Sequence, residues 1–201
     1  MKPATRDGAA PQGEVHRLFF ALWPDTTMRA QIVAATDVLQ QYPHQRGRWL
    51  KPHRYHLTLH FLGDFPRMPD ALAARAHSIG TGAKGSAFTL SLDRAGSFGN
   101  RSIPWWLGCS QTPAEMSDLW NQLATVMRHC EVAYEAKLPL TPHVTVLRDS
   151  DVTLPSMPIP PLIWQVDEFV LIHSCLGAQA QYRLLGRWPL RRDERSATLK
   201  K

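Results

Sequence analysis

The sequence predicts an α+β fold with two related lobes. Apolar runs typical of strands are interspersed with Ala-rich or amphipathic segments typical of helices, and their order is mixed. A strand, a helix and a strand carrying the pattern His-x-Thr occur in succession twice, with the pattern at His56 and again at His143, 87 positions later. This recurrence favours two similar lobes within one domain, with the change of lobe near residues 93–104.

Turn and cap residues divide the first half of the chain into elements. The run "HRLFFALWPD" stops at Pro24, and Asp25 or Thr26 can cap the helix that follows. The glycines of "GTGAKG" close an Ala-rich helix. The predicted elements are the strand before Pro24, a helix to about Gln41, strand segments on both sides of Pro52 that end at Gly63 and Asp64, and a helix from Met68 to Ile79.

The second half is predicted to be rich in strands. "AFTLSLDRAGSFGN" and "SIPWWLGCS" have the character of two antiparallel strands joined by a Gly-containing loop. The remaining predicted elements are a helix from Pro113 to about Cys130, the second histidine strand, a Pro-rich connection from Leu154 to Pro161, and two closing strands, "WQVDEFVLIHSCL" and "YRLLGRWPL".

The two ends of the chain differ in composition from the segment between them. Residues 1–14 have no apolar stretch that could serve as a signal peptide and are predicted to be a disordered leader. Residues 191–201 form a basic tail, and the segment 187–201 supplies +4 of the net charge of +6. We therefore expect a single bilobal domain at 15–190. The excess of positive charge favours an anionic partner such as RNA, but much of it lies at this end.

Cysteine usage and hydropathy indicate a cytoplasmic protein with no membrane segment. The apolar run Leu18–Trp23 is too short to span a bilayer. Cys109, Cys130 and Cys175 are odd in number and lack the C-x-x-C spacing, which argues against a disulfide framework and against a cysteine-ligated zinc.

The two His-x-Thr patterns are the candidate catalytic elements. Side chains alternate between the faces of a strand, so His56 and Thr58 share one face, and Leu57, Leu59 and Phe61 take the other. The same reasoning pairs His143 with Thr145. Two such strands facing one cleft would offer an imidazole acid, an imidazole base and two hydroxyls for an anionic oxygen, which suits hydrolysis of a cyclic phosphate without a metal.

Arg148 could add a guanidinium to this site, but its position in the strand is unfavourable. In an ideal strand it falls on the face of Val144 and Val146, so it reaches the cleft only if the strand ends or bulges after Val146. His60 is expected on the His56 face, where it could perturb the pKa of His56. A metal site at His53, His56 and His60 is disfavoured because no carboxylate accompanies them.

The remaining histidines and aromatic residues carry weaker signals. His16, His44, His77, His129 and His173 stand in no comparable pattern and are expected to be surface or structural residues. Trp105 and Trp106 could stack on a base, although at least one of them should face the core.

The motifs and their flanks resemble the 2H phosphoesterases, and within them the bacterial RNA 2′,3′-cyclic phosphodiesterases, also called 2′-5′ RNA ligases. The resemblance covers about residues 17–190 through "RLFFALWPD", "GRWLKPHRYHLTLHFLGD", "WWLG", "LTPHVTVLRD", "VDEFVLIHSCL" and "YRLLGRWPL". It implies the bilobal LigT-like fold, with pseudo-twofold symmetry and antiparallel sheets flanking a central cleft.

The resemblance also implies an activity and a role for each site residue. The reaction would be metal-independent opening of RNA 2′,3′-cyclic phosphate ends to 2′-phosphates, with reversible 2′-5′ ligation. His143 would be the proton acceptor, His56 the proton donor, and Thr58, Thr145 and Arg148 would bind the phosphate. We expect a monomer that needs no cofactor and acts on RNA ends or small cyclic nucleotides. The alternatives are an RNA-end binding module without significant catalysis and a phosphodiesterase for another substrate, such as 2′-5′ oligonucleotides or cyclic ADP-ribose phosphate.

Overall fold

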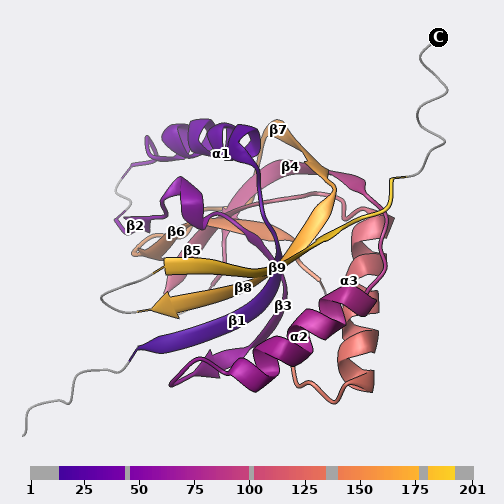
Figure 1. The fold of residues 1–201 in the computed structure, drawn as a ribbon. Coiled ribbons are helices and arrows are strands. Elements are labelled where there is room, and N and C mark those ends of the chain that lie inside the picture. Colours follow the sequence, from indigo (N-terminus) through magenta and orange to yellow (C-terminus); the bar gives the residue numbers. More distant parts are fainter. Residues whose placement is uncertain (1–13, 44–45, 100–101, 135–139, 177–180, 193–201) are drawn as a thin grey trace, which may run out of the picture.

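The fold is an antiparallel sheet with helices on its outside, seen in a computed structural model that describes residues 14–43, 46–99, 102–134, 140–176 and 181–192 (Figure 1). The strands are β1 (Val15–Leu22), β2 (Arg48–Trp49), β3 (Leu57–Phe65), β4 (Phe88–Ser97), β5 (Ile103–Gly108), β6 (His143–Ser150), β7 (Met157–Val166), β8 (Glu168–Leu176) and β9 (Gln181–Pro189). The helices are α1 (Thr26–Leu39), α2 (Asp70–Gly82), α3 (Ala114–His129) and the short 3₁₀ helix η1 (Pro52–Arg54). The predicted leader, apart from Glu14, and the predicted tail from residue 193 onward lie outside the described residues.

The two histidine strands meet at the middle of the sheet. The strand order is β7-β4-β5-β6-β3-β1-β8-β9, with β2 paired to β6. β3 and β6 are joined through the register pair Leu57 and Val144. One lobe therefore contains β6, β5, β4 and β7, the other contains β3, β1, β8 and β9, and the predicted α+β class with two lobes is confirmed.

The division of the chain between the lobes differs from the prediction. A change of lobe near residues 93–104 is wrong, because β4 and β5 pair with each other inside one lobe. The predicted strand at 164–176 is instead two strands that break at Asp167, since β7 ends in one lobe and β8 begins in the other. The last two strands thus complete the lobe that the first strand begins.

The Pro-rich segment predicted as a connection is largely strand β7. This strand lies at the edge of the sheet and pairs with β4 alone. An edge strand tolerates proline because the N–H groups on its outer side need no partner strand, which explains how Pro158, Pro160 and Pro161 fit into it.

α1 and α3 each pack on the lobe opposite to that of the strand they follow. α1 follows β1 but contacts β7, whereas α3 follows β5 but contacts β3. α2 lies beside α3 and contacts β8 and β9 (Figure 1). The described part of the chain holds no helix long and apolar enough to cross a membrane.

Local signals explain the helix boundaries. Asp25 caps α1 as predicted, because its carboxylate accepts a hydrogen bond from the Met28 backbone N–H at 2.7 Å. α2 continues past the predicted end at Ile79 and includes Gly80, where a Cβ atom would lie 2.4 Å from the Trp188 ring. That glycine serves close packing and does not end the helix.

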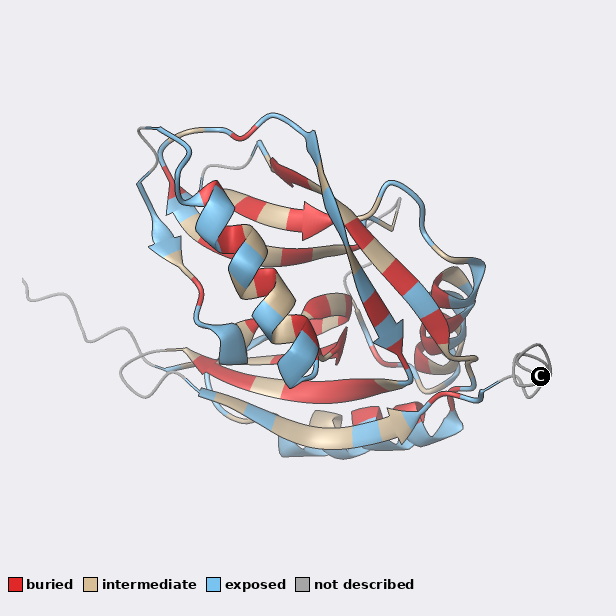
Figure 2. Cartoon of the chain, turned by 90° about the horizontal axis from the view of Figure 1, so that it is seen from above, coloured by how far each residue is buried: buried red, intermediate tan, exposed pale blue. Residues whose placement is uncertain are grey.

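The main core is continuous across both lobes. It includes Phe20 and Phe169 from one lobe, Trp105 and Leu92 from the other, and Ile32 from α1, all at most 1% exposed. Figure 2 shows that buried segments recur along the strands and on α1. The opposite face of the sheet, which does not contribute to this main core, carries the candidate site.

Candidate active site

The β3–β6 junction sets the relative positions of the two His-x-Thr patterns. Leu57 and Val144 are fully buried, so their neighbours in each strand point to the opposite face. In an antiparallel pair with this register, His56 lies across from Thr145, and Thr58 lies across from His143. Each imidazole is therefore next to the hydroxyl of the other pattern.

Both candidate catalytic histidines are held by the same backbone contact. The Nδ1 atom of His56 lies 2.8 Å from the Arg54 carbonyl oxygen, and Nδ1 of His143 lies 2.8 Å from the Thr141 carbonyl oxygen. A carbonyl only accepts, so Nδ1 carries the proton in each ring and donates it. In the neutral ring, Nε2 is then the atom that can take up a proton.

Aromatic side chains enclose each ring. The His56 ring lies 4.9 Å from the Phe19 ring and 5.4 Å from the Tyr182 ring, centroid to centroid. The His143 ring lies 4.8 Å from the Phe98 ring at a steep angle. These contacts limit the rotation of both rings.

The pKa of His56 is lowered to about 4, chiefly because the ring is buried. The carbonyl of Arg54 opposes this shift, and the positive charges of Arg148, His143 and Arg54 add to it. His56 is consequently neutral at pH 7 while the site contains no anion.

A bulge in β3 changes the positions of His60 and Phe61. The β1–β3 register pairs Ala21 with Thr58 and Phe20 with His60, so Leu59 is the extra residue. Leu59 and His60 are both buried, which corrects the prediction that His60 shares the His56 face. Phe61 instead emerges on the His56 face and lines the pocket, which corrects its predicted position on the opposite face.

His60 serves the packing of α3 against β3. It is 1% exposed, its Nε2 donates to the Trp120 carbonyl at 2.8 Å, and its ring stacks on the Trp120 ring at 4.8 Å. Burial lowers the pKa of His60, so the ring is neutral in the core. Since His60 is on the opposite face of β3, it neither perturbs His56 nor joins a metal site with His53 and His56.

A matching bulge in β6 turns Arg148 toward the cleft. The β5–β6 register pairs Trp106 with Thr145 and Trp105 with Leu147, so Val146 is the extra residue. Val146 and Leu147 are both fully buried, and Arg148 emerges on the same face as Thr145. The condition under which Arg148 reaches the cleft is thereby met.

The pocket beside His56 is open, basic and about 120 Å³ in volume. Its lining consists of Arg17, Phe19, Arg48, Leu50, Arg54, His56, Thr58, Phe61, Arg148, Ser174, Leu176 and Tyr182. Of the predicted site residues, His56, Thr58 and Arg148 thus face one pocket. His143 and Thr145 are half-buried on the adjacent strand and are not part of this lining.

Three of the pocket arginines have partners at short distance, whereas Arg148 makes no salt bridge to an acidic side chain of the described residues. Arg17 donates twice to the Asp64 carboxylate, at 2.8 and 3.1 Å, and Arg48 donates to Asp149 at 3.4 Å. The Arg54 guanidinium lies over the Tyr182 ring at 4.4 Å. Burial lowers the pKa of Arg148, because the charged guanidinium loses contact with water. An anion bound in the pocket would compensate for that loss and stabilise the charged form.

Sequence reasoning missed Arg17, Arg48, Arg54 and Tyr182 as pocket residues. Arg54 stands two residues before His56, a spacing that could have suggested it. Tyr182 comes from β9, where nothing in the local pattern indicates proximity to His56. Trp105 is fully buried, as predicted for one of the tryptophan pair, and Trp106 is half-buried.

Comparisons with known proteins agree with this architecture. A family model described as "LigT like Phosphoesterase" matches residues 22–106. The Escherichia coli K12 protein named RNA 2′,3′-cyclic phosphodiesterase is 34% identical over 183 residues, covering 88% of this chain and 98% of its own length. A Thermus thermophilus protein of the same name is 28% identical and covers 87% of this chain and 90% of its own length.

Solved structures show the same fold. The crystal structure of E. coli LigT in apo form superposes with a TM-score of 0.69 at 33% identity, covering 89% of this chain and 99% of that one. E. coli LigT complexed with 3′-AMP gives a TM-score of 0.68 at 33% identity, covering 88% and 98% of the two chains.

Proposed function

The chain belongs to the LigT-like phosphoesterase family, and we propose on this basis that it hydrolyses RNA 2′,3′-cyclic phosphate ends to 2′-phosphates. The observation that carries the proposal is the pair of imidazoles at the β3–β6 junction, each with its Nδ1 bound to a backbone carbonyl. Two such rings next to a basic pocket suit an acid–base reaction on a phosphate.

In the proposed reaction the two histidines move one proton each. Nε2 of His143 takes a proton from water as the water oxygen attacks phosphorus. The bond between phosphorus and the 3′ oxygen breaks, and Nε2 of His56 gives its proton to that oxygen. The products are a 2′-phosphate and a 3′-hydroxyl. Attack by an RNA 5′-hydroxyl in place of water would break the same bond and give a 2′-5′ linkage, and this ligation is reversible.

Three further side chains are proposed to bind the phosphate. The hydroxyls of Thr58 and Thr145 can donate to its oxygens, and Arg148 supplies positive charge as negative charge builds up on the phosphorane. No metal is needed for these steps. The E. coli relative has been solved with 3′-AMP and with phosphate, which supports a nucleotide phosphate as the ligand of this cleft.

We also propose that the protein works as a monomer in the cytoplasm. Its three cysteines are free thiols, which suits a reducing compartment. The substrate class would be RNA ends or small cyclic nucleotides, because the pocket is small and lined by four arginines.

The test is turnover of a 2′,3′-cyclic nucleotide and of cyclic-phosphate-ended RNA in excess EDTA, with product identity read by phosphorus NMR. Wild type should yield the 2′-phosphate, and His56→Ala or His143→Ala should lose roughly 10²–10⁴-fold in rate. His53→Ala is the matched control, since His53 is an exposed histidine on η1. Binding of RNA without turnover would favour the end-binding module, and turnover of a 2′-5′ oligonucleotide alone would favour the other phosphodiesterase.

A further inference from the structure

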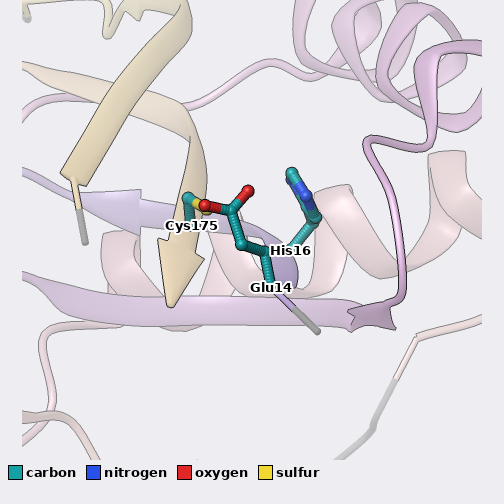
Figure 3. Close-up of side chains that lie close together, drawn as sticks. All are labelled: Glu14, His16 and Cys175. Atoms are coloured by element: carbon teal, nitrogen blue, oxygen red, sulfur yellow. The ribbon is translucent and has the colours of Figure 1, made fainter. Parts of the chain in front are cut away.

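A cluster of metal-binding side chains lies on the face of β1 and β8 that is turned away from the pocket. Arg17, Ser174 and Leu176 line the pocket, so strand alternation puts His16 and Cys175 on the opposite face. His16 and Cys175 are directly paired in the β1–β8 register, and Glu14 is two residues before His16. One potential ligand atom from each of these three residues lies within 4.8 Å of the other two (Figure 3).

A second histidine supports the cluster. Nδ1 of His16 lies 2.8 Å from Nε2 of His173, and the two ring planes differ by 5°. His173 is two residues before Cys175 and therefore shares its face. With Nδ1 of His16 engaged in this way, Nε2 is the atom left to bind a metal, an arrangement common where a second group orients a ligating imidazole.

We propose that Glu14, His16 and Cys175 bind a zinc ion, with His173 orienting His16. A thiolate, an imidazole and a carboxylate are a donor set that zinc accepts, and zinc usually takes four ligands, which leaves one position for water. The donor atoms need to close by about 1 Å to reach tetrahedral zinc distances. Glu14 is exposed at the start of β1, so it has room to make that adjustment.

A reactive free thiol is the competing explanation for Cys175. It fits poorly, because Cys175 is only 6% exposed and an oxidant or electrophile in solution has little access to it. The C-x-x-C rule, which argued against a cysteine-ligated zinc, does not apply to this cluster. That rule detects ligands that are close in sequence, whereas His16 and Cys175 come from opposite ends of the chain.

The expected role of this site is structural. A metal here would tie the beginning of β1 to the end of β8, and the alternate residues of these strands line the pocket on the other face. The site therefore does not depend on the proposed hydrolysis and can exist whether or not that reaction occurs.

The experiment uses untagged full-length protein freed of metal by chelation and titrated with Co²⁺ or with Zn²⁺. We expect one Co²⁺ per chain, with a thiolate-to-cobalt charge-transfer absorption that is absent in Cys175→Ser and present in Cys109→Ser and Cys130→Ser. Saturating Zn²⁺ should raise the Tm of wild type by a few degrees and leave that of Cys175→Ser unchanged.

Two further variants keep the test decisive if Cys175→Ser folds poorly. His16→Gln should lose the Co²⁺ absorption, and His173→Gln should weaken zinc affinity roughly 10–100-fold. The same absorption in His56→Ala and wild type would separate this site from the proposed catalytic one. Absence of the charge-transfer band in wild type, or its persistence in Cys175→Ser or His16→Gln, would overturn the proposal.

Discussion

At the scale of single residues, the lowered pKa of His56 conflicts with its proposed role as proton donor. The proposed reaction requires it to donate a proton, yet burial lowers its pKa to about 4, and the charges of Arg148 and His143 add to the shift. A bound phosphate would raise the pKa of His56 again, because its negative charge would offset the positive charges of the neighbouring arginines. We therefore expect His56 to gain its proton together with the substrate.

This expectation gives a titration experiment. The pKa of His56, followed by imidazole NMR, should be about 4 in the free protein and should rise by one unit or more when inorganic phosphate or a 2′-nucleotide binds. Phosphate binding should accordingly strengthen as the pH falls toward the raised pKa. Arg148→Gln should raise the pKa of His56 in the free protein because a like charge is lost, and Arg148→Lys should not. A pKa that does not respond to phosphate would contradict the argument.

Arg148 is the other residue for which the size of the effect of a substitution on the reaction rate can be predicted. It occupies the same position after the second His-x-Thr pattern as Phe61 does after the first, and both follow a bulge. The two halves of the site are therefore unequal, with charge on one side and an aromatic ring on the other. Removing a preorganised charge next to a transition state costs about 10²–10³-fold in rate.

Arg148→Gln should therefore lower kcat/KM for a 2′,3′-cyclic nucleotide by that amount. Arg148→Lys should recover part of it, because the ammonium keeps the charge but lacks the planar fork of donors. Steady-state kinetics on both variants, with circular dichroism to check folding, would decide the matter. Equal activity of Arg148→Gln and wild type would exclude Arg148 from the reaction.

At the scale of elements, the paired bulges explain what the sequence could predict and what it could not. Strict alternation correctly put His56 with Thr58 and His143 with Thr145, because no bulge falls inside either pattern. It misplaced His60 and Phe61, because a bulge one residue later reverses the faces. Bulges depend on the register with a neighbouring strand, and a single strand's sequence carries little information about that register.

The position of His60 in the core makes a testable distinction. His60→Ala should lower the free energy of unfolding by about 2–4 kcal/mol, since it leaves a cavity beside Trp120 and frees a buried carbonyl. The kcat of the folded fraction should stay close to that of wild type, because His60 faces away from the pocket. Urea unfolding and kinetics on the same samples provide the measurement.

His53→Ala is a suitable comparison for this variant. His53 is exposed on η1, so its loss should change stability by less than about 0.5 kcal/mol. If His60→Ala abolished turnover with little loss of stability, the assignment of His60 to packing would be wrong.

At the scale of the whole molecule, the strand order separates two lobes, but these are not two successive stretches of the chain, and the two share one main core. The C-terminal strands β8 and β9 complete the lobe that β1 begins, and α1 and α3 each pack on the lobe opposite to that of the strand they follow. The sequence repeat indicated two lobes, but periodicity does not encode which helix packs on which lobe. Nor does it encode which strands pair, so the predicted change of lobe near residues 93–104 was wrong because β4 and β5 pair inside one lobe, while most local elements agree with the structure.

This interleaving predicts how the protein unfolds. Neither lobe can keep its core if the other is lost, because α1 covers β7 and α3 covers β3. The single main core also joins residues of both lobes, such as Phe20 and Trp105. The metal-free protein should therefore unfold in one cooperative transition, as a small single domain does, although it looks bilobal.

Calorimetry provides the measurement. The calorimetric enthalpy should equal the van't Hoff enthalpy, and far-UV circular dichroism and tryptophan fluorescence should give the same midpoint in urea. Ile32→Ala in α1 should shift that midpoint without splitting the transition, even though it perturbs the contact of α1 with only one lobe. Two resolved transitions, or a variant that melts one lobe while the other persists, would show that the lobes are energetically independent and that the swapped helices do not couple them.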